Sequence, residues 1–444
     1  MPNRHILICG DVMVDVHLQL NNKGMTSLQL GGVFHSARAL SALKQSYGLG
    51  FMAPSYLKEN IYECASKLNV KEVFEFGSVD CAPNVILIGE PTEAGNQGYI
   101  ELLGTQKKSP LNWQEIKKND WADYTDVLIY PGAYDWVCLT NFFQESGKDV
   151  HIDLQYVSSS EIKELQLVRG LNTLFLSTSS PVFSDICKKQ PDKVAELATD
   201  CCQRVILKEN RGGSRLFRCA DSKWISVPCY PIQCLHSVGV GDCYNAAFLA
   251  SLRIGCSEEV ALNRASLSAA FYAGTLDFTE LDALLSCLSE VDIDFFDNIR
   301  LPWEKRQDIH IYLAGPDFPN VDTSLIDKVE RNLKYHNFST HRPIQENGLI
   351  TGRETESEEL RIFQNDIQLL KECDLLVAIS LTEDSGTMAE LGYFRQMQKP
   401  AILFDPLNKI DNMFVQRIVN RVCYNFTELT EAVFAELGGQ RNDQ

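Results

Sequence analysis

The sequence lacks several features that would point to particular classes of protein. Its 15 cysteines form no CxxC pair and no Cys/His cluster at zinc-ligand spacing, which argues against the common structural zinc sites. They stand singly apart from Cys201 and Cys202, so we expect reduced thiols in a cytoplasmic protein. The sequence has no internal repeat, no low-complexity tract and no apolar run of transmembrane length. The apolar run at residues 5–9 has the length of a buried strand rather than a signal peptide.

Positive charge is also scarce. The chain has 41 Lys and Arg residues against 59 Asp and Glu residues, which gives a formal net charge of -18. A charge of this sign argues against a nucleic-acid groove and against an anionic membrane surface, although a local basic pocket stays open. We therefore expect small-molecule partners.

The length and the order of the apolar segments predict two α/β domains. A chain of 444 residues exceeds the size of most single cores. Short apolar runs, such as residues 126–130 and 172–177, alternate with helix-like segments, which is typical of a largely parallel sheet. We place a larger domain at residues 1–291 and a smaller domain at 309–444. Residues 292–308 show neither helix nor strand periodicity, and we expect them to form a linker.

The segment HSVGVGDCYNAAFLASL, residues 236–252, carries a glycine-rich turn before a helical pattern. Gly239 and Gly241 permit a sharp turn, and the start of the helix presents backbone N–H groups and a positive dipole end to an anion. Asp242, at the mouth of this helix, is placed to accept a proton from a hydroxyl group that attacks phosphorus. The alternative is a simple helix start with Asp242 as a capping residue.

This segment resembles the second signature of the ribokinase-like (PfkB) carbohydrate and nucleoside kinases, and the resemblance covers about residues 1–290. The segments GDVMVDV, GGVFHSARAL and LKENRGGSRLF resemble the family's first strand, its substrate turn and the strand beside the nucleotide. The resemblance implies a ribokinase-like fold with a mostly parallel central sheet, Asp242 as the catalytic base, and ATP with Mg²⁺ as cofactors. It also implies substrate contacts at Asp11, Asp15, Gly31 and Gly32, and a nucleotide and anion site at Gly239, Val240, Gly241, Lys208 and Gly213.

Two positions depart from the pattern of that family. Ser36 stands where the family usually has Asn after its Gly-Gly turn, and the serine-rich residues 177–180 replace an Asn-x-x-Glu motif near the metal. Loss of the carboxylate weakens the hold on Mg²⁺ and its water shell, because hard cations prefer anionic oxygen ligands. The sequence is consistent with two interpretations of this domain: an active kinase, and a domain that only senses a nucleotide or sugar.

Near the other end of the chain, two carboxylates flank a Gly-Thr turn. Residues 374–380 indicate a buried strand, 381–386 the loop at its carboxyl end and 387–398 a helix, so Asp384 and Glu390 fall where open α/β sheets bind ligands. We expect Glu390 in the first turn of the helix, where the dipole favours an ionised carboxylate suited to nucleophilic attack on carbon. The alternative is a Glu that pairs with the amides of the helix start.

The motifs IYLAGPDF, FQNDIQLLKECDLLVAI, DSGTMAELGY and KPAILF occur in an order and spacing that resemble the nucleoside 2-deoxyribosyltransferase family over about residues 309–435. The resemblance implies a smaller Rossmann-like (flavodoxin-like) α/β domain in which Glu390 is the nucleophile at the anomeric carbon. It implies that Asp366 handles the proton of the departing base and that Tyr312 orients the nucleophile. It implies substrate contacts at Asp384, which holds the sugar 5′-hydroxyl, at Gly315 and at Asn412, and a homo-oligomer in which Asn412 reaches a neighbouring subunit's site.

These patterns predict an enzyme that cleaves or transfers the N-glycosidic bond of nucleosides, with no metal or cofactor in the C-terminal domain. In the first hypothesis the N-terminal domain also phosphorylates a sugar or nucleoside with ATP. In the second it is degenerate and serves as a nucleotide or sugar sensor or as an assembly module. The base, the sugar and the final acceptor stay open. Arg342 is a candidate contact for an anionic substrate, and His341 is expected to be a structural loop residue.

Overall fold

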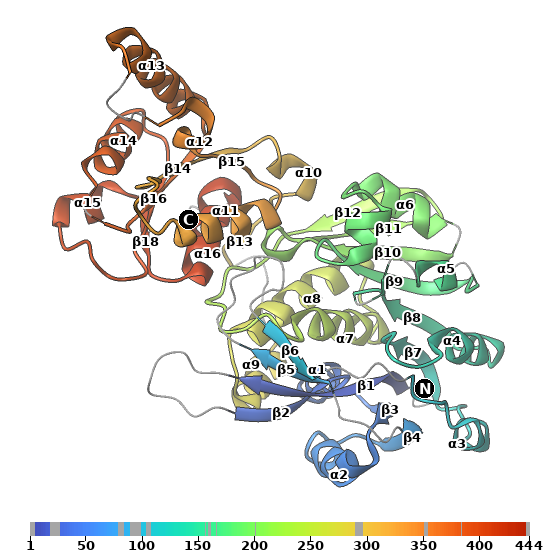
Figure 1. Cartoon of the computed structure of the whole chain (residues 1–444). Coiled ribbons are helices and arrows are strands. Elements are labelled where there is room, and N and C mark those ends of the chain that lie inside the picture. Colours follow the sequence, from blue (N-terminus) through green and yellow to red (C-terminus); the bar gives the residue numbers. More distant parts are fainter. Residues whose placement is uncertain are drawn as a thin grey trace. The chain divides into compact units, whose positions relative to one another are not determined.

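The structure is a computed structural model, and it describes residues 5–17, 27–78, 84–88, 99–103, 108–155, 157–158, 161–165, 167–199, 201–288, 296–349, 354–382 and 384–440. These residues form two compact units, with the division between Asn298 and Ile299. Figure 1 labels the helices and strands of both.

The first unit alternates strands and helices, as the sequence predicts. Its strands are β1 (His5–His17), β2 (Ser27–Gly32), β3 (Tyr47–Ala53), β4 (Glu72–Ser78), β5 (Val85–Ile88), β6 (Tyr99–Leu103), β7 (Tyr124–Ile129), β8 (Asp149–Asp153), β9 (Leu171–Ser177), β10 (Cys202–Lys208), β11 (Ser214–Arg218) and β12 (Lys223–Val227). Its helices are α1 (Phe34–Ala42), α2 (Lys58–Lys67), α3 (Trp113–Lys118), α4 (Trp136–Glu145), α5 (Ile162–Leu165), α6 (Pro191–Thr199), α7 (Val240–Arg253), α8 (Glu258–Ala273) and α9 (Phe278–Ser286), with short turns η1 (Ser55–Leu57), η2 (Val182–Ile186) and η3 (Asn210–Gly212).

A 12-stranded sheet organises this unit, with the order β12-β11-β10-β9-β8-β7-β1-β3-β4 along its main path. The strands from β10 to β4 on this path run parallel, and β11 and β12 extend the sheet antiparallel. Beside this path, β2 pairs antiparallel with β1, β5 pairs parallel with β1, and β6 pairs antiparallel with β5. The observed order confirms the predicted mostly parallel central sheet.

The strands are apolar because helices cover both faces of a parallel sheet. Strand β3 is buried along its whole length, as are residues 5–10 of β1. One core joins β1 and β3 to α1, α7 and α8, and Figure 1 shows α7 and α8 lying over the sheet. Helix α4 packs against β8, and helix α6 packs against β10. The carboxyl ends of β8 and β10 meet the N-terminal half of α7, where Asp153 and Lys208 form hydrogen bonds with Asn245.

The second unit is a smaller α/β layer structure. Its strands are β13 (Asn298–Ile299), β14 (His310–Ala314), β15 (Ser339–His341), β16 (Leu375–Ile379), β17 (Ala401–Phe404), β18 (Arg421–Cys423) and β19 (Gly439–Gln440), and its helices are α10 (Trp303–Arg306), α11 (Ser324–Tyr335), α12 (Pro343–Asn347), α13 (Glu356–Glu372), α14 (Ser385–Gln396), α15 (Met413–Ile418) and α16 (Phe426–Gly438). Five strands form a parallel sheet in the order β15-β14-β16-β17-β18, and β13 pairs with β19.

Side-chain alternation along β14 decides which residues reach the candidate site. Ile311 and Leu313 pack with α11 and α16 on one face of the sheet. Tyr312 and Ala314 pack on the other face with apolar residues of α13 and α14. Because successive side chains of a strand point to opposite faces, Tyr312 is directed toward the helix that carries Glu390.

Part of the segment that we expected to be a linker packs into the second unit. Ile299, Leu301 and Trp303 are almost fully buried. Ile299 and Leu301 belong to the core of the second unit, and the amide of Arg300 donates to the carbonyl of Gly438 at 3.1 Å. The segment is too short to show a helix or strand period, so its apolar residues gave no signal in the sequence. Residues 289–295 of this region lie outside the described residues. Within the described ranges, no helix is long and apolar enough to cross a membrane.

Candidate active sites

The candidate site of the second unit is centred on Glu390, which lies in α14. The hydroxyl of Tyr312 donates to its Oε1 at 2.7 Å. Tyr312 is fully buried, so its ring is fixed by packing and its hydroxyl holds one orientation of the carboxylate. The predicted pair of Tyr312 and Glu390 is therefore together in the structure, and it joins two residues that are 78 positions apart in the chain.

Glu390 lies one turn deeper in its helix than we expected. Asp384 is the N-cap of α14, which makes Glu390 the sixth helical residue rather than a member of the first turn. The helix dipole acts mainly within the first turn, so it does not dominate the charge of this carboxylate. Burial instead raises the pKa of Glu390 to about 7, opposed by the Tyr312 hydrogen bond and supported by the negative charges of Asp366 and Asp384. The predicted first-turn position of Glu390 is wrong, because the helix begins at Ser385 and not at Thr387.

Asp366, in α13, is close enough to Glu390 to raise its pKa electrostatically. Its own pKa is raised by burial, which suits a group that must carry a proton to a leaving base. The amide of Asn347, at the end of α12, donates to Asp366 Oδ1 at 2.7 Å. Sequence reasoning did not find Asn347. Its position before Gly348, which has a φ of 101°, marks a helix end but indicates no partner.

Asp384 caps helix α14. Its Oδ2 accepts from the amide of Thr387 at 2.8 Å and from the hydroxyl of Thr387 at 2.6 Å. The capping role considered for a carboxylate of this motif therefore belongs to Asp384. Among the described residues, no hydrogen bond to its Oδ1 is present, so this oxygen is available to a ligand hydroxyl.

The two other predicted contact residues differ in their surroundings. Gly315 follows β14 directly, and an added Cβ there would lie 3.2 Å from the Ile326 side chain and 3.6 Å from Ile379, which favours a residue without a side chain. Asn412 is exposed and caps α15 by accepting from the amides of Phe414 and Val415 at 3.0 and 3.4 Å. Among the described residues, no hydrogen bond joins Asn412 to Glu390.

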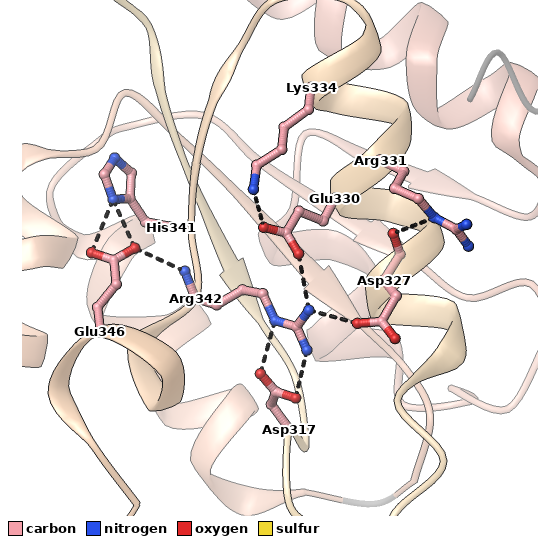
Figure 2. A network of polar contacts seen from close by, with 8 residues as sticks. All are labelled: Asp317, Asp327, Glu330, Arg331, Lys334, His341, Arg342 and Glu346. Carbon is pink, nitrogen blue, oxygen red and sulfur yellow. Dashed lines mark hydrogen bonds and ion pairs between the residues drawn. The ribbon is translucent and has the colours of Figure 1, made fainter. Parts of the chain in front are cut away.

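Arg342 follows β15 and is held by carboxylates (Figure 2). It donates to both oxygens of Asp317 at 2.9 and 2.7 Å, to Asp327 at 2.6 Å and to Glu330 at 2.9 Å. Its side chain is only 5% exposed. These ion pairs raise the pKa of Arg342, although burial opposes them. The guanidinium is therefore occupied by the protein's own carboxylates and is not presented to an anionic substrate.

In the first unit, Asp242 lies in the first turn of α7, as predicted. The N-cap is Gly239, whose φ of 74° is a left-handed value that favours glycine. An added Cβ at Gly239 would lie 2.2 Å from the ring of His35, so the turn also needs the missing side chain for space. Burial raises the pKa of Asp242 to about 6, with His35 and Lys208 opposing and Asp153 reinforcing the rise. A carboxylate with this pKa is ionised at neutral pH and can accept a proton.

Lys208 ends β10 beside this helix start. Its ammonium lies 2.8 Å from Asp153 Oδ2 and 3.1 Å from Asn245 Oδ1. An added Cβ at Gly241 would lie 3.1 Å from the Lys208 ammonium, which places the cation against the first turn of α7. The sequence predicted Lys208 near an anion but did not find Asp153 or Asn245 as its partners.

The predicted substrate residues of β1 and β2 are engaged within the protein. Asp15 is 1% exposed and lies 3.2 Å from His35 Nε2, and its carboxylate fills the space where Gly31 would carry a side chain. Asp11 Oδ2 accepts from the amide of Ala133 at 2.9 Å, and burial raises its pKa to about 6 despite this bond. Both aspartates are therefore held in fixed orientations.

The remaining predicted glycines and Ser36 shape the backbone around the site. Gly32 and Gly213 have φ values of 61° and 107°, and an added Cβ would lie 2.2 and 2.4 Å from backbone oxygen atoms. Ser36 is fully buried. Its hydroxyl pairs with the hydroxyl of Tyr130 at 2.6 Å and donates to the carbonyl of Asp242 at 3.1 Å. Ser36 thus links α1 to the first turn of α7.

Comparison with known proteins gives separate results for the two units. Residues 311–420 match the family model described as nucleoside 2-deoxyribosyltransferase. The second unit carries a nucleoside 2-deoxyribosyltransferase domain. An uncharacterized protein of Ureaplasma parvum, UU063, is 28% identical over 144 residues, which are 28% of this chain and 90% of that protein.

The first unit has the ribokinase-like fold. Adenosine kinase from Sinorhizobium meliloti superposes with a TM-score of 0.51 at 16% identity and covers 63% of this chain and 98% of its own. The microbiome-derived acarbose kinase Mak1 superposes with a TM-score of 0.50 at 17% identity and covers 64% of this chain and 99% of its own. The predicted pairing of a ribokinase-like unit with a deoxyribosyltransferase domain is confirmed.

The residues of the ribokinase-like unit do not fit a Mg²⁺ site. Mg²⁺ is usually held by one or two free carboxylates together with substrate phosphates. Residues 177–180, after β9, offer hydroxyl groups instead, and two of these, on Ser177 and Ser179, pair with each other at 2.8 Å. The carboxylate of Asp153 is already neutralised by Lys208. Across the described part of the chain, no group of three or more His, Cys, Asp or Glu residues could hold a metal ion.

Proposed function

We propose that the deoxyribosyltransferase domain cleaves or exchanges the N-glycosidic bond of nucleosides or deoxynucleosides. The observation that carries the proposal is the 2.7 Å hydrogen bond from the buried Tyr312 hydroxyl to Glu390 Oε1. This bond leaves the other carboxylate oxygen of Glu390 for attack on carbon. Asp366, whose pKa is raised by burial, lies within electrostatic range of the same carboxylate.

The reaction proceeds in two displacements. Glu390 attacks the anomeric carbon through an oxocarbenium-like state, and the bond between that carbon and the base nitrogen breaks as Asp366 gives its proton to the base. A covalent ester between the sugar and Glu390 results. A second base or a water molecule then attacks the same carbon, Asp366 takes up the proton, and Glu390 leaves as a carboxylate. The first acceptor gives transfer, and the second gives hydrolysis.

The direct test is base release from a panel of nucleosides, measured by mass spectrometry. Glu390→Ala should lose base release by several orders of magnitude while a cooperative melting curve shows that the protein stays folded. Glu359→Ala, at an exposed position of α13, is the matched control and should keep full activity. A folded Glu390→Ala variant with near-normal base release would disprove the assignment. Trapping of a sugar ester on the wild-type protein would support it independently.

Phosphoryl transfer by the ribokinase-like unit is a second candidate function, favoured by the position of Asp242 in the first turn of α7 and by its pKa of about 6. In this reaction Asp242 accepts the proton of a sugar or nucleoside hydroxyl, and the amides at Gly239, Val240 and Gly241 face the transferred phosphoryl group. Asp242→Asn should abolish coupled formation of ADP and a sugar phosphate but leave base release unchanged. Asp192→Asn, an exposed change in the same unit, is its control. Absence of any such product from the wild type would leave nucleotide or sugar sensing as the role of this unit.

A further inference from the structure

A cluster of three polar side chains lies where β8 and β10 end beside α7. Its members are Asp153 of β8, Lys208 of β10 and Asn245 of α7. Lys208 Nζ lies 2.8 Å from Asp153 Oδ2, and the Asn245 amide donates to that same oxygen at 2.5 Å. The Lys208 side chain is 11% exposed, Asp153 is 3% exposed and Asn245 is fully buried. An ion pair on the surface would contribute little to the stability of the fold, but these partners hold a buried lysine in one position.

The cluster is directed at the start of α7. The Lys208 ammonium lies against Gly241, and it acts electrostatically on Asp242. An ammonium has three N–H donors, and Asp153 and Asn245 accept two of them. No acceptor for the third is present among the described residues. Beside the cluster, the amide of Thr178 donates to the carbonyl of Lys208, and the buried hydroxyl of Thr178 has no hydrogen-bond partner in the described part of the chain.

These positions contrast with the lack of a Mg²⁺ donor set. The carboxylate that could serve a metal, Asp153, is bound to a lysine, and residues 177–180 supply only neutral oxygen atoms. The cluster thus holds an ammonium, whose third N–H has no acceptor among the described residues, next to backbone amides at a helix N-terminus. These two features together stabilise an anion.

We propose that the ribokinase-like unit binds the phosphate groups of a nucleotide through the Lys208 ammonium and the first turn of α7, without a requirement for Mg²⁺. The inference rests on the proposed anion site at Gly239 to Gly241 and not on the glycosidic chemistry of the second unit. Lys208 supplies an N–H donor to the phosphate oxygens in place of a metal ion, and Asp153 and Asn245 keep the ammonium beside the helix start.

The test is calorimetric titration of the full-length protein with ADP and with adenylyl imidodiphosphate, a non-hydrolysable ATP analogue, once with Mg²⁺ and once with excess EDTA. The wild-type Kd should differ by less than about threefold between the two conditions. Lys208→Met should weaken binding in EDTA by about 10- to 100-fold, the effect of losing one charge-assisted hydrogen bond. Lys208→Arg should restore part of the affinity. Lys223→Met, which removes an exposed lysine of β12, should change nothing.

Asp153→Asn separates the two possible roles of that carboxylate. If Asp153 only positions and neutralises Lys208, the amide keeps an acceptor oxygen while the negative charge beside Lys208 is removed, so ADP should bind as tightly as before or more tightly. If Asp153 is a metal ligand, the same change should weaken binding in Mg²⁺ and have no effect in EDTA. Melting curves of each variant establish that it is folded before titration.

The outcomes distinguish this inference from the proposal on which it rests. Binding in EDTA that depends on Lys208 supports the inference. Binding that appears only with Mg²⁺, or that Asp153→Asn removes in Mg²⁺ alone, overturns it and leaves the anion site intact. No binding of either nucleotide under both conditions overturns the inference together with the anion site, while base release by the second unit would be untouched.

Discussion

The burial of Glu390 predicts that neutralising it stabilises the protein in a pH-dependent way. Burial raises the pKa of this carboxyl from 4.5 to about 7. Between these values the native state binds a proton that the unfolded chain has already released, so wild-type stability falls as the pH rises through this window. Below pH 4.5 the group is protonated in both states, and above pH 7 the full cost is present.

The magnitude follows from linkage. One pKa unit corresponds to about 1.4 kcal/mol, so the rise from 4.5 to about 7 has an upper limit of about 3.4 kcal/mol at pH 8. The Glu390 side chain is partly exposed, and solvent screening reduces this figure to about 1–3 kcal/mol. For a domain of this size, 1 kcal/mol moves Tm by about 3–4 °C. Glu390→Gln should therefore raise the Tm of the second unit by about 3–12 °C at pH 8, and by much less at pH 5.

Differential scanning calorimetry of the full-length protein at both pH values measures this effect. Glutamine keeps the shape of the side chain and an oxygen that can accept from the Tyr312 hydroxyl, so the change removes charge and little else. Glu359→Gln, at an exposed position, should show no pH-dependent difference from the wild type. A Tm gain of equal size at pH 5 and pH 8, or no gain at pH 8, would refute the conclusion that Glu390 is destabilised in its ionised form.

Three further predictions concern the same domain. Tyr312→Phe removes a hydrogen bond to the ionised form of Glu390, worth about 1.5–3 kcal/mol, so the pH of half-maximal base release should rise by about one to two units. An unchanged pH–rate profile would show that this bond does not lower the pKa of Glu390. Asp384→Asn should narrow the preference of the enzyme for a nucleoside over its 5′-monophosphate, measured as the ratio of kcat/KM values, and a wild-type preference for the monophosphate would contradict this. The protein should be an oligomer by light scattering, because the apolar side chain of Met413, beside Asn412, is 69% exposed. Met413→Lys should weaken the assembly, and a fully active 50.0 kDa monomer would contradict this expectation.

Sequence patterns predicted those residues whose role depends on their position along a helix or strand. Asp242 at a helix start and Tyr312 on one face of β14 follow from local glycines and from strand alternation, together with the family resemblance. The missed residues are partners across the fold. Asn347 meets Asp366 over 19 positions and Asp153 meets Lys208 over 55. Periodicity indicates which face a side chain occupies, but the partner on that face depends on how strands are ordered in the sheet, and a single sequence does not contain that order.

The partners of Arg342 bear directly on the choice between a nucleoside and its monophosphate. A guanidinium free to reach the 5′ end of the sugar would offset the repulsion between a phosphate and Asp384. Figure 2 shows it bound instead to Asp317, Asp327 and Glu330. These carboxylates occupy the guanidinium, so Arg342 is not presented to a phosphate. If Asp384 faces the 5′ position, as the family resemblance implies, it then acts there alone. A carboxylate repels a phosphate by about one to four kcal/mol, depending on exposure, and accepts a hydrogen bond from a hydroxyl. Both effects favour the unphosphorylated nucleoside.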